Sequence, residues 1–93
     1  MQTYEMMCIF DPKLSAEAET TGMVESILKE GGAADVTRED LGLKRLAYLI
    51  NKKTEGRYFL FHFSLDQQAV AGIRKELGIK EGLLRHLIVR REA

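Results

Sequence analysis

The stretch that decides the fold is Leu41 to Phe63, LGLKRLAYLINKKTEGRYFLFHF, which has the pattern of two strands folded back on each other. Apolar residues alternate with other residues on both halves, and a period of two lets each half bury one face as a β-strand does. We expect the buried side to carry Leu46, Tyr48, Ile50, Phe59, Phe61 and Phe63. Lys52 to Gly56 is predicted to be the turn, so the stretch predicts a β-hairpin with one dry side.

The other side of this hairpin is predicted to be a binding face. It carries Arg45, Ala47, Leu49, Tyr58, Leu60 and His62. This set is too apolar for a purely solvated surface and too poor in acids and thiols for a reaction centre. We therefore expect this face to bind another molecule.

The order of elements along the chain predicts the fold class. The sequence predicts a strand at Tyr4 to Phe10, a helix from an N-cap at Ser15 to Glu30, a strand from Ala34 to Asn51 with a bulge at Gly42, a strand at Tyr58 to Leu65, a helix at Gln67 to Leu77 capped by Asp66, and a strand at Leu83 to Arg91. This order is typical of the ferredoxin-like α+β fold, a four-stranded antiparallel sheet with two helices on one face. The first and third strands are then central, and residues 1–93 form a single domain.

The charge of the chain is balanced in total but not along its length. Residues 1–40 hold nine acids and three bases, whereas residues 41–93 hold five acids and eleven bases. A neutral total argues against indiscriminate coating of nucleic acid, but the basic half can supply phosphate contacts at a specific site. The alternative is an ordinary solvated surface. No apolar run approaches the length of a membrane span, and no signal peptide is apparent, so we expect a cytoplasmic protein.

The residue types that usually perform catalysis make a weak case for an enzyme in this sequence. Cys8 is the single cysteine and lies in an alternating apolar run, which indicates a core residue. His62 and His86 are expected on the open face of the sheet, but on strands that are not neighbours. No glycine-rich phosphate loop follows a strand. A small ferredoxin-like enzyme or oligomeric ligand sensor stays open as an alternative.

The third predicted strand is partly similar to the stacking strand of RNA-recognition modules. That strand needs a basic residue, a glycine and aromatic residues at set positions. Here Glu55 stands at the basic position and Arg57 stands where the first aromatic residue should be. The first strand presents Met7 and Ile9 on the open face where a stacking ring is wanted. A standalone single-stranded RNA binder of this type is therefore a second alternative, and base stacking is not the expected mode.

Basic residues instead gather on the second and fourth predicted strands, which this topology places at the edges of the sheet, or in turns beside these strands. They are Lys44, Arg45, Lys52, Lys53, Arg57, Arg85, Arg90 and Arg91. Charge on edge strands also serves to block aggregation, and this accounts for part of the set. The remainder suits contacts to phosphates.

Short motifs along the whole chain resemble one known family. They are Tyr4-Glu5, Asp11-Pro12 with Leu14, Gly31-Gly32, Leu41 to Tyr48 with Ile50 and Lys52, Glu55-Gly56 with Tyr58, and Leu84 to Leu87 with Val89 and Arg90. Together they resemble the bacterial small-subunit (30S) ribosomal protein six family, and Gly42 to Lys52 is the most specific part. Leu49 departs from a proline common in the family, and Ala33 to Asp40 is one residue longer than usual, which predicts an extra bulge.

The resemblance implies a structural protein of the small ribosomal subunit. It implies binding to the central domain of the small-subunit ribosomal RNA together with small-subunit protein eighteen, a role in subunit assembly, and a cytoplasmic location in the ribosome. It implies no catalysis, cofactor, metal, membrane or small-molecule substrate. The RNA-facing residues carried over from the family are Lys44, Arg45, Arg85 and Arg90, with Tyr4 and Lys52 as further candidates. Exposed apolar side chains beside an edge add a protein-partner interface at Leu43, Tyr58, Leu60 and His62.

Overall fold

The computed structural model describes residues 1–11, 17–50, 53–79 and 83–91. Its elements, in chain order, are β1 (Gln2–Phe10), α1 (Glu17–Glu30), β2 (Ala34–Ile50), β3 (Lys53–Leu65), the 3-10 turn η1 (Gln67–Ala69), α2 (Val70–Gly78) and β4 (Leu83–Arg91). This order confirms the predicted βαββαβ arrangement. The proposed N-cap Ser15 lies outside the described residues.

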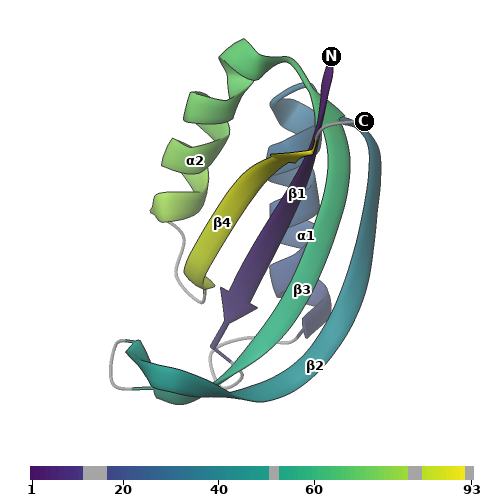
Figure 1. Cartoon of the computed structure of the whole chain (residues 1–93). Helices are drawn as coiled ribbons and strands as arrows, with labels where there is room; N and C mark the ends of the chain where they lie inside the picture. Colours follow the sequence, from purple (N-terminus) through teal and green to yellow (C-terminus); the bar gives the residue numbers. More distant parts are fainter. Residues whose placement is uncertain (12–16, 51–52, 80–82, 92–93) are drawn as a thin grey trace.

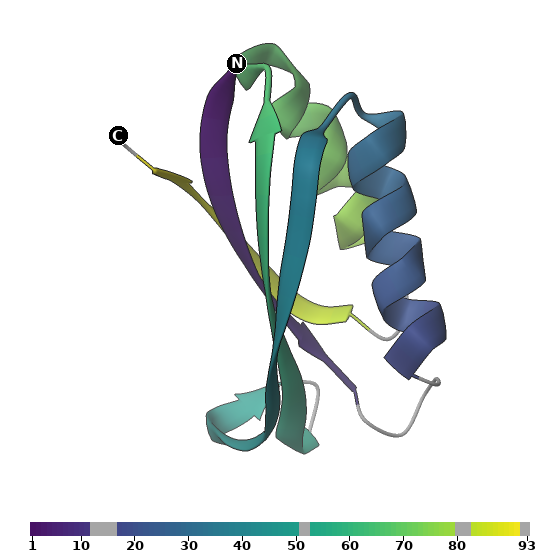
Figure 2. The same ribbon diagram turned by 90° about the vertical axis from the view of Figure 1, so that its right-hand side faces the viewer.

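The four strands form one antiparallel sheet in the order β2-β3-β1-β4. The first and third strands are therefore central and the second and fourth lie at the edges, as predicted. Figures 1 and 2 show both helices on the same face of the sheet, which leaves the opposite face open. The β2–β3 hairpin runs on past the ends of β1 and β4 and twists strongly there (Figures 1 and 2).

The hydrophobic core lies between the sheet and the two helices. Alternate residues of β1 and β3 point into it, because successive strand side chains point to opposite faces. Its buried members among the described residues are Tyr4, Met6, Cys8, Phe10, Val24, Ile27, Leu28, Phe59, Phe61, Phe63, Leu65, Ile73, Leu77 and Ile88. The predicted buried face of β3 is confirmed, and α1 contributes Val24, Ile27 and Leu28 to the core.

One end of each helical segment has capping hydrogen bonds. At the end of α1, Gly32 adopts a φ of 96° and its N–H donates to the Lys29 carbonyl, while the Ala33 N–H donates to the Leu28 carbonyl. This pair of bonds is a Schellman cap, which favours glycine at the left-handed position. At the start of the second helical segment, the Asp66 carboxylate accepts from the Gln68 N–H, so the predicted cap is confirmed, although the first turn is 3-10.

Apart from a register shift between Arg45 and Ile50, two one-residue bulges interrupt the described pairing of β2 with β3. One lies between Asp40 and Gly42, where Gly42 has a φ of 87° and its N–H donates to Asp40 Oδ1 at 2.8 Å. The other lies between Ala34 and Thr37 and includes Asp35 at a φ of 55°. The bulge predicted at Gly42 and the extra bulge predicted between Ala33 and Asp40 are both confirmed.

The hairpin itself corrects two expectations. β3 begins at Lys53, and Glu55 and Gly56 are paired with β2, so residues 53–56 belong to the strand and not to the predicted turn. Lys44 lies opposite Gly56 and Arg45 lies opposite Glu55. Since opposite residues share a face, Arg45 lies on the parity of Phe59 and not beside Tyr58 as predicted.

Leu46 is likewise displaced from the predicted dry side. It shares the parity of Lys44, and a Cβ placed on Gly56 would lie 3.3 Å from Leu46 Cδ2 and 2.4 Å from Ile9 Cγ2. Leu46 therefore packs toward the open face. The cause is register: an extra residue in one strand exchanges the two faces of everything beyond it.

Candidate functional site

The open face of the sheet is a mostly apolar surface made by three neighbouring strands. Pairing places Leu60, Met7 and Leu87 side by side across β3, β1 and β4. Leu87 is 61% exposed and Val89 is 49% exposed, and both lie on this face of β4. Adjacent exposed apolar side chains on one sheet face are typical of a contact surface for another protein.

Among the described residues, Glu5 lies on this face in β1, and Glu39 of β2 lies opposite Leu60. Glu5 Oε1 is 3.1 Å from Arg91 Nη1 and 3.7 Å from His62 Nδ1. The separation from His62 is too long for a hydrogen bond, so the pair is not an oriented acid–base couple. A negative group in the middle of the face also disfavours contact with a phosphate backbone there.

The four residues predicted for a protein interface do not all lie together. Tyr58, Leu60 and His62 lie in a row on β3 and face the open side, where each is half-buried. Leu43 is 53% exposed but lies opposite Arg57, on the other face of the hairpin. The sequence reasoning missed Leu87 and Val89 for this surface, although their alternation on the last strand was visible.

The predicted RNA-facing residues fall into two groups on opposite edges of the sheet. Lys44 and Arg45 are exposed on β2, where Lys44 Nζ lies 5.8 Å from the centre of the Tyr58 ring. Arg85 and Arg90 are exposed on β4. β3 and β1 separate the two groups, so they do not form one patch. Lys52 lies outside the part of the chain that the structure describes.

Tyr4 occupies a different environment from that expected of an RNA contact. Its side chain is 4% exposed, and its ring stacks on Phe63 with centroids 5.9 Å apart. Both residues belong to the core between sheet and helices. This burial assigns the Tyr4 ring to core packing and leaves no aromatic face for a base to stack on.

A basic groove lies between α2 and β4. It has a volume of about 540 Å³ and is lined by Tyr4, Gln67, Val70, Ala71, Arg74, Ile88 and Arg90. Arg90 reaches it because it lies opposite Tyr4 and so shares the helix side of the sheet. Arg74 lies on α2, and its Nη2 donates to the Ile88 carbonyl at 3.5 Å. Two guanidinium groups beside one groove favour an anion such as phosphate.

Arg74 was not singled out from the sequence. Its position on a helix gave no signal by itself, because the groove needs α2 to pack beside β4. The usable signal was indirect: Arg90 and Ile88 share one parity, and Ile88 is apolar enough to face the core.

His86 corrects one further expectation. It lies opposite Cys8 and therefore on the helix side of the sheet, not on the open face with His62. Burial, and after it the positive charge of Arg74, lower the pKa of His86 below its usual value. A neutral His86 at physiological pH adds no positive charge beside the groove.

The groups that could perform reactions are dispersed or inert. Burial raises the pKa of the Cys8 thiol to about 12, so it is not a nucleophile at physiological pH. Over the described ranges, no three histidine, cysteine, aspartate or glutamate side chains gather closely enough to hold a metal ion. In the same ranges, no helix has the length and apolar character needed to cross a membrane.

Comparison with known proteins identifies the family. Residues 3–90 match the model of the family described as Ribosomal protein S6. The small ribosomal subunit protein bS6 of Thermoanaerobacter pseudethanolicus is 38% identical over 93 residues, covering 97% of each chain, and that of Desulforamulus reducens is 36% identical over 92 residues, again covering 97% of each.

Solved structures agree with this match. The crystal structure of 30S ribosomal protein S6 from Thermotoga maritima superposes with a TM-score of 0.88 at 26% identity, over 97% of this chain and 87% of that one. The C-terminal domain of the MgtC protein from Mycobacterium tuberculosis shares the fold alone, with a TM-score of 0.57 at 15% identity. The chain belongs to the ribosomal protein S6 family and is a structural, non-catalytic component of the small ribosomal subunit, located in the ribosome in the cytoplasm.

Proposed function

We propose that this protein binds the central domain of the small-subunit ribosomal RNA together with small-subunit protein eighteen, and that it supports assembly of the subunit as a single domain of residues 1–93. Two separate surfaces support this division of roles. The basic groove between α2 and β4 suits phosphate, and the apolar open face suits protein.

The observation that carries the RNA part is the pair of arginines at the groove. Arg74 and Arg90 approach it from different elements, so a phosphate in the groove is held from two sides. Arg85 and the Lys44–Arg45 pair extend positive charge to the two edges of the sheet. Phosphate contacts of this kind fix position and orientation without reading bases.

The observation that supports a protein partner is the row formed by Leu60, Met7 and Leu87 with Val89 beside it. Covering these side chains removes apolar area from water, at about 25 cal/mol per Å². Tyr58 and His62 border the row on β3, and Lys44 lies over the Tyr58 ring. A partner on this face therefore meets an apolar centre with a polar rim, as protein interfaces do.

A standalone single-stranded RNA binder fits less well. Such a module stacks bases on aromatic rings of its two central strands. Here β1 offers Met7 and Ile9 on the open face and β3 offers Tyr58, while Tyr4 is buried.

The test is binding to a central-domain ribosomal RNA fragment across a salt series, with and without protein eighteen. We expect Arg90→Gln and Arg45→Ala to weaken binding and to reduce the slope of log K against log salt by up to about 0.9 for each phosphate that the variant no longer neutralises. Lys75→Gln is the matched control, since Lys75 is exposed on α2 but does not line the groove. Equal weakening in the control, or binding that ignores the partner, would contradict the proposal.

A further inference from the structure

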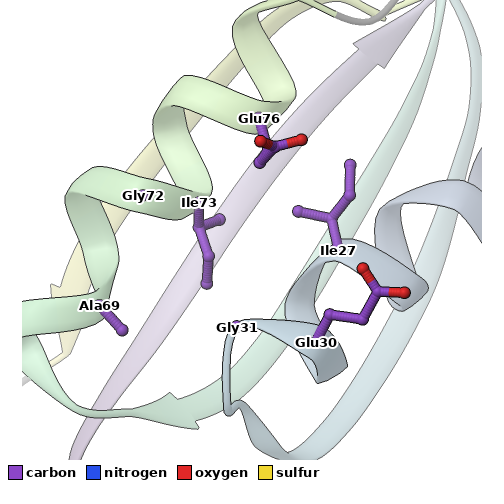
Figure 3. A pocket seen from close by; sticks show the side chains of 7 residues that line it. All are labelled: Ile27, Glu30, Gly31, Ala69, Gly72, Ile73 and Glu76. Carbon is purple, nitrogen blue, oxygen red and sulfur yellow. The ribbon is translucent and has the colours of Figure 1, made fainter.

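A second cavity lies between the two helices, away from the basic groove and from the open face. It has a volume of about 530 Å³ and is lined by Ile27, Glu30, Gly31, Ala69, Gly72, Ile73 and Glu76. Figure 3 shows Ile27 and Ile73 on facing sides of the space between α1 and α2, with Glu30 on the α1 side and Glu76 on the α2 side. We call this cavity the interhelical cleft.

The floor of the cleft depends on close approach of the two helices. A Cβ on Gly31 would lie 2.9 Å from both Cγ1 and Cδ1 of Ile73, so only glycine lets the end of α1 come this near to α2. Ile73 and Ile27 are both buried. The floor is therefore apolar and fixed by packing, and the cleft exists without rearrangement.

The rim of the cleft carries two negative charges that form no ion pair among the described residues. Glu30 and Glu76 each lie in the last turn of their helix, where a negative charge opposes the helix dipole. Neither carboxylate has an ion pair within the described part of the chain, in contrast to Glu25 of α1, which is 2.7 Å from Arg38 Nη1. Lys29 and Lys75 lie in the same turns but do not line the cleft.

Gly72 is a third feature at the cleft that lowers local stability, after the two glutamates. Glycine inside a helix is destabilising relative to alanine. Nothing lies within 4 Å of a Cβ built on Gly72, and its φ is not in the left-handed region, so neither packing nor backbone geometry requires glycine. It lies in the wall of the cleft, where a side chain would occupy the open space. Local costs that converge on one place are typical of functional sites.

We propose that the interhelical cleft binds an arginine side chain, flanked by apolar residues, from a second protein. The aliphatic part of an arginine can lie on Ile27 and Ile73 while its guanidinium lies between the two carboxylates. The negative rim disfavours RNA at this place. The interaction is independent of the RNA and open-face proposals, because it uses none of their residues.

The test uses the whole protein, labelled with ¹⁵N, and the peptide Ac-Leu-Arg-Leu-NH₂ as the probe. We expect saturable shifts of the Gly31 and Gly72 amide resonances. The double variant Glu30→Gln/Glu76→Gln should bind the peptide at least about fivefold more weakly, since it removes the two exposed charges proposed to pair with the guanidinium. Gly72→Leu, which fills the cleft, should also weaken binding.

Matched variants control for charge and for helix stability. Lys29→Gln/Lys75→Gln changes two charges in the same turns, and Gly22→Leu changes a helical glycine with open space outside the cleft. Both should bind the peptide at least as well as the wild type.

Three results would overturn the proposal. They are the absence of saturable shifts at Gly31 and Gly72, equal binding of the same peptide with citrulline in place of arginine, and equal or tighter binding of spermidine, which carries charge without apolar flanks. None of these results depends on whether the protein binds ribosomal RNA.

Discussion

Gly56 shows how one missing side chain sets the shape of the sheet. It is buried in β3, and the open-face side chain of Ile9 fills the space where its Cβ would be, at 2.4 Å from Ile9 Cγ2. The sequence suggested a turn residue at this position, because glycine is common in turns. The actual reason for glycine is close contact between strands, which depends on a residue far away in the chain.

Gly56→Ala should lower the free energy of unfolding by about 1–3 kcal/mol, because the methyl group overpacks a filled site. Gly72→Ala is the matched control. Its Cβ meets open space, so it should raise the free energy of unfolding by about 0.4–1 kcal/mol. Urea denaturation measures both. Unchanged stability of Gly56→Ala would mean that Ile9 moves aside at no cost.

His86 shows how a partner on another element controls titration. Its pKa is lowered first by burial and then by Arg74. With the folded pKa below the unfolded one, the unfolded chain takes up the proton more readily. The contribution of His86 to stability is therefore full above the unfolded pKa, about 6.5, and is lost as the pH falls from there through the folded value.

Arg74→Gln should raise the pKa of His86 but leave it below its usual value, since burial is the larger cause. An NMR titration of the imidazole resonances measures this directly. Lys75→Gln, on the same helix, should leave the pKa unchanged. A pKa that did not respond to Arg74→Gln would show that burial alone sets it.

The second strand shows what irregular pairing does to an element. Its two bulges each add one residue, and each exchanges the faces of the residues that follow. The second bulge is held by Gly42 at a φ of 87° and by the hydrogen bond from its N–H to Asp40. Asp40 also pairs with Arg57 at 2.7 Å, so one carboxylate joins the bulge to the neighbouring strand.

Gly42→Ala should therefore lower the free energy of unfolding by about 1–2 kcal/mol, because a Cβ is strained in left-handed backbone. Faster amide exchange at the paired residues Leu43 and Arg57 should accompany it, with little change between β1 and β4. Gly22→Ala, a helical glycine with open space, should instead stabilise the protein. Wild-type exchange rates in the hairpin of Gly42→Ala would contradict this account of the bulge.

The molecule as a whole separates its surfaces by chemistry. Apolar contacts lie on the open face, positive charge lies at the groove between α2 and β4, and negative charge lies at the interhelical cleft. Both helices lie on one side of the sheet (Figure 2), so the sheet separates the open face from the groove and the cleft that helix residues line. A substitution on one surface should therefore leave binding at the others intact.

Leu87→Ser tests this separation. Leu87 is 61% exposed, so its replacement should change the free energy of unfolding by no more than about 0.5 kcal/mol. We expect binding of protein eighteen to weaken about five- to tenfold, as for a central apolar side chain of an interface, measured by isothermal titration calorimetry. RNA binding without the partner should be unchanged.

The neighbouring residue provides the contrast for this substitution. Ile88 is 7% exposed, and Ile88→Ala should cost about 2–5 kcal/mol of stability. If the Leu87→Ser variant bound protein eighteen as tightly as the wild type does, the partner would have to bind elsewhere than on the open face.

The sequence by itself determined the order of elements, the fold class, the buried face of β3, the bulge at Gly42 and the cap at Asp66. These features follow from period, glycine and capping patterns, which act between residues close along the chain. The family was also recognisable from short motifs.

Tertiary structure alone decided where the surfaces lie. The face of Arg45 and Leu46 followed from bulges and register, and the face of His86 followed from its pairing with Cys8. Arg74 and Arg90 line one groove, and Ile27 and Ile73 line one cleft, only because the helices pack on the sheet and on each other. Such contacts join residues far apart in the chain, and local pattern carries no information about which of them meet.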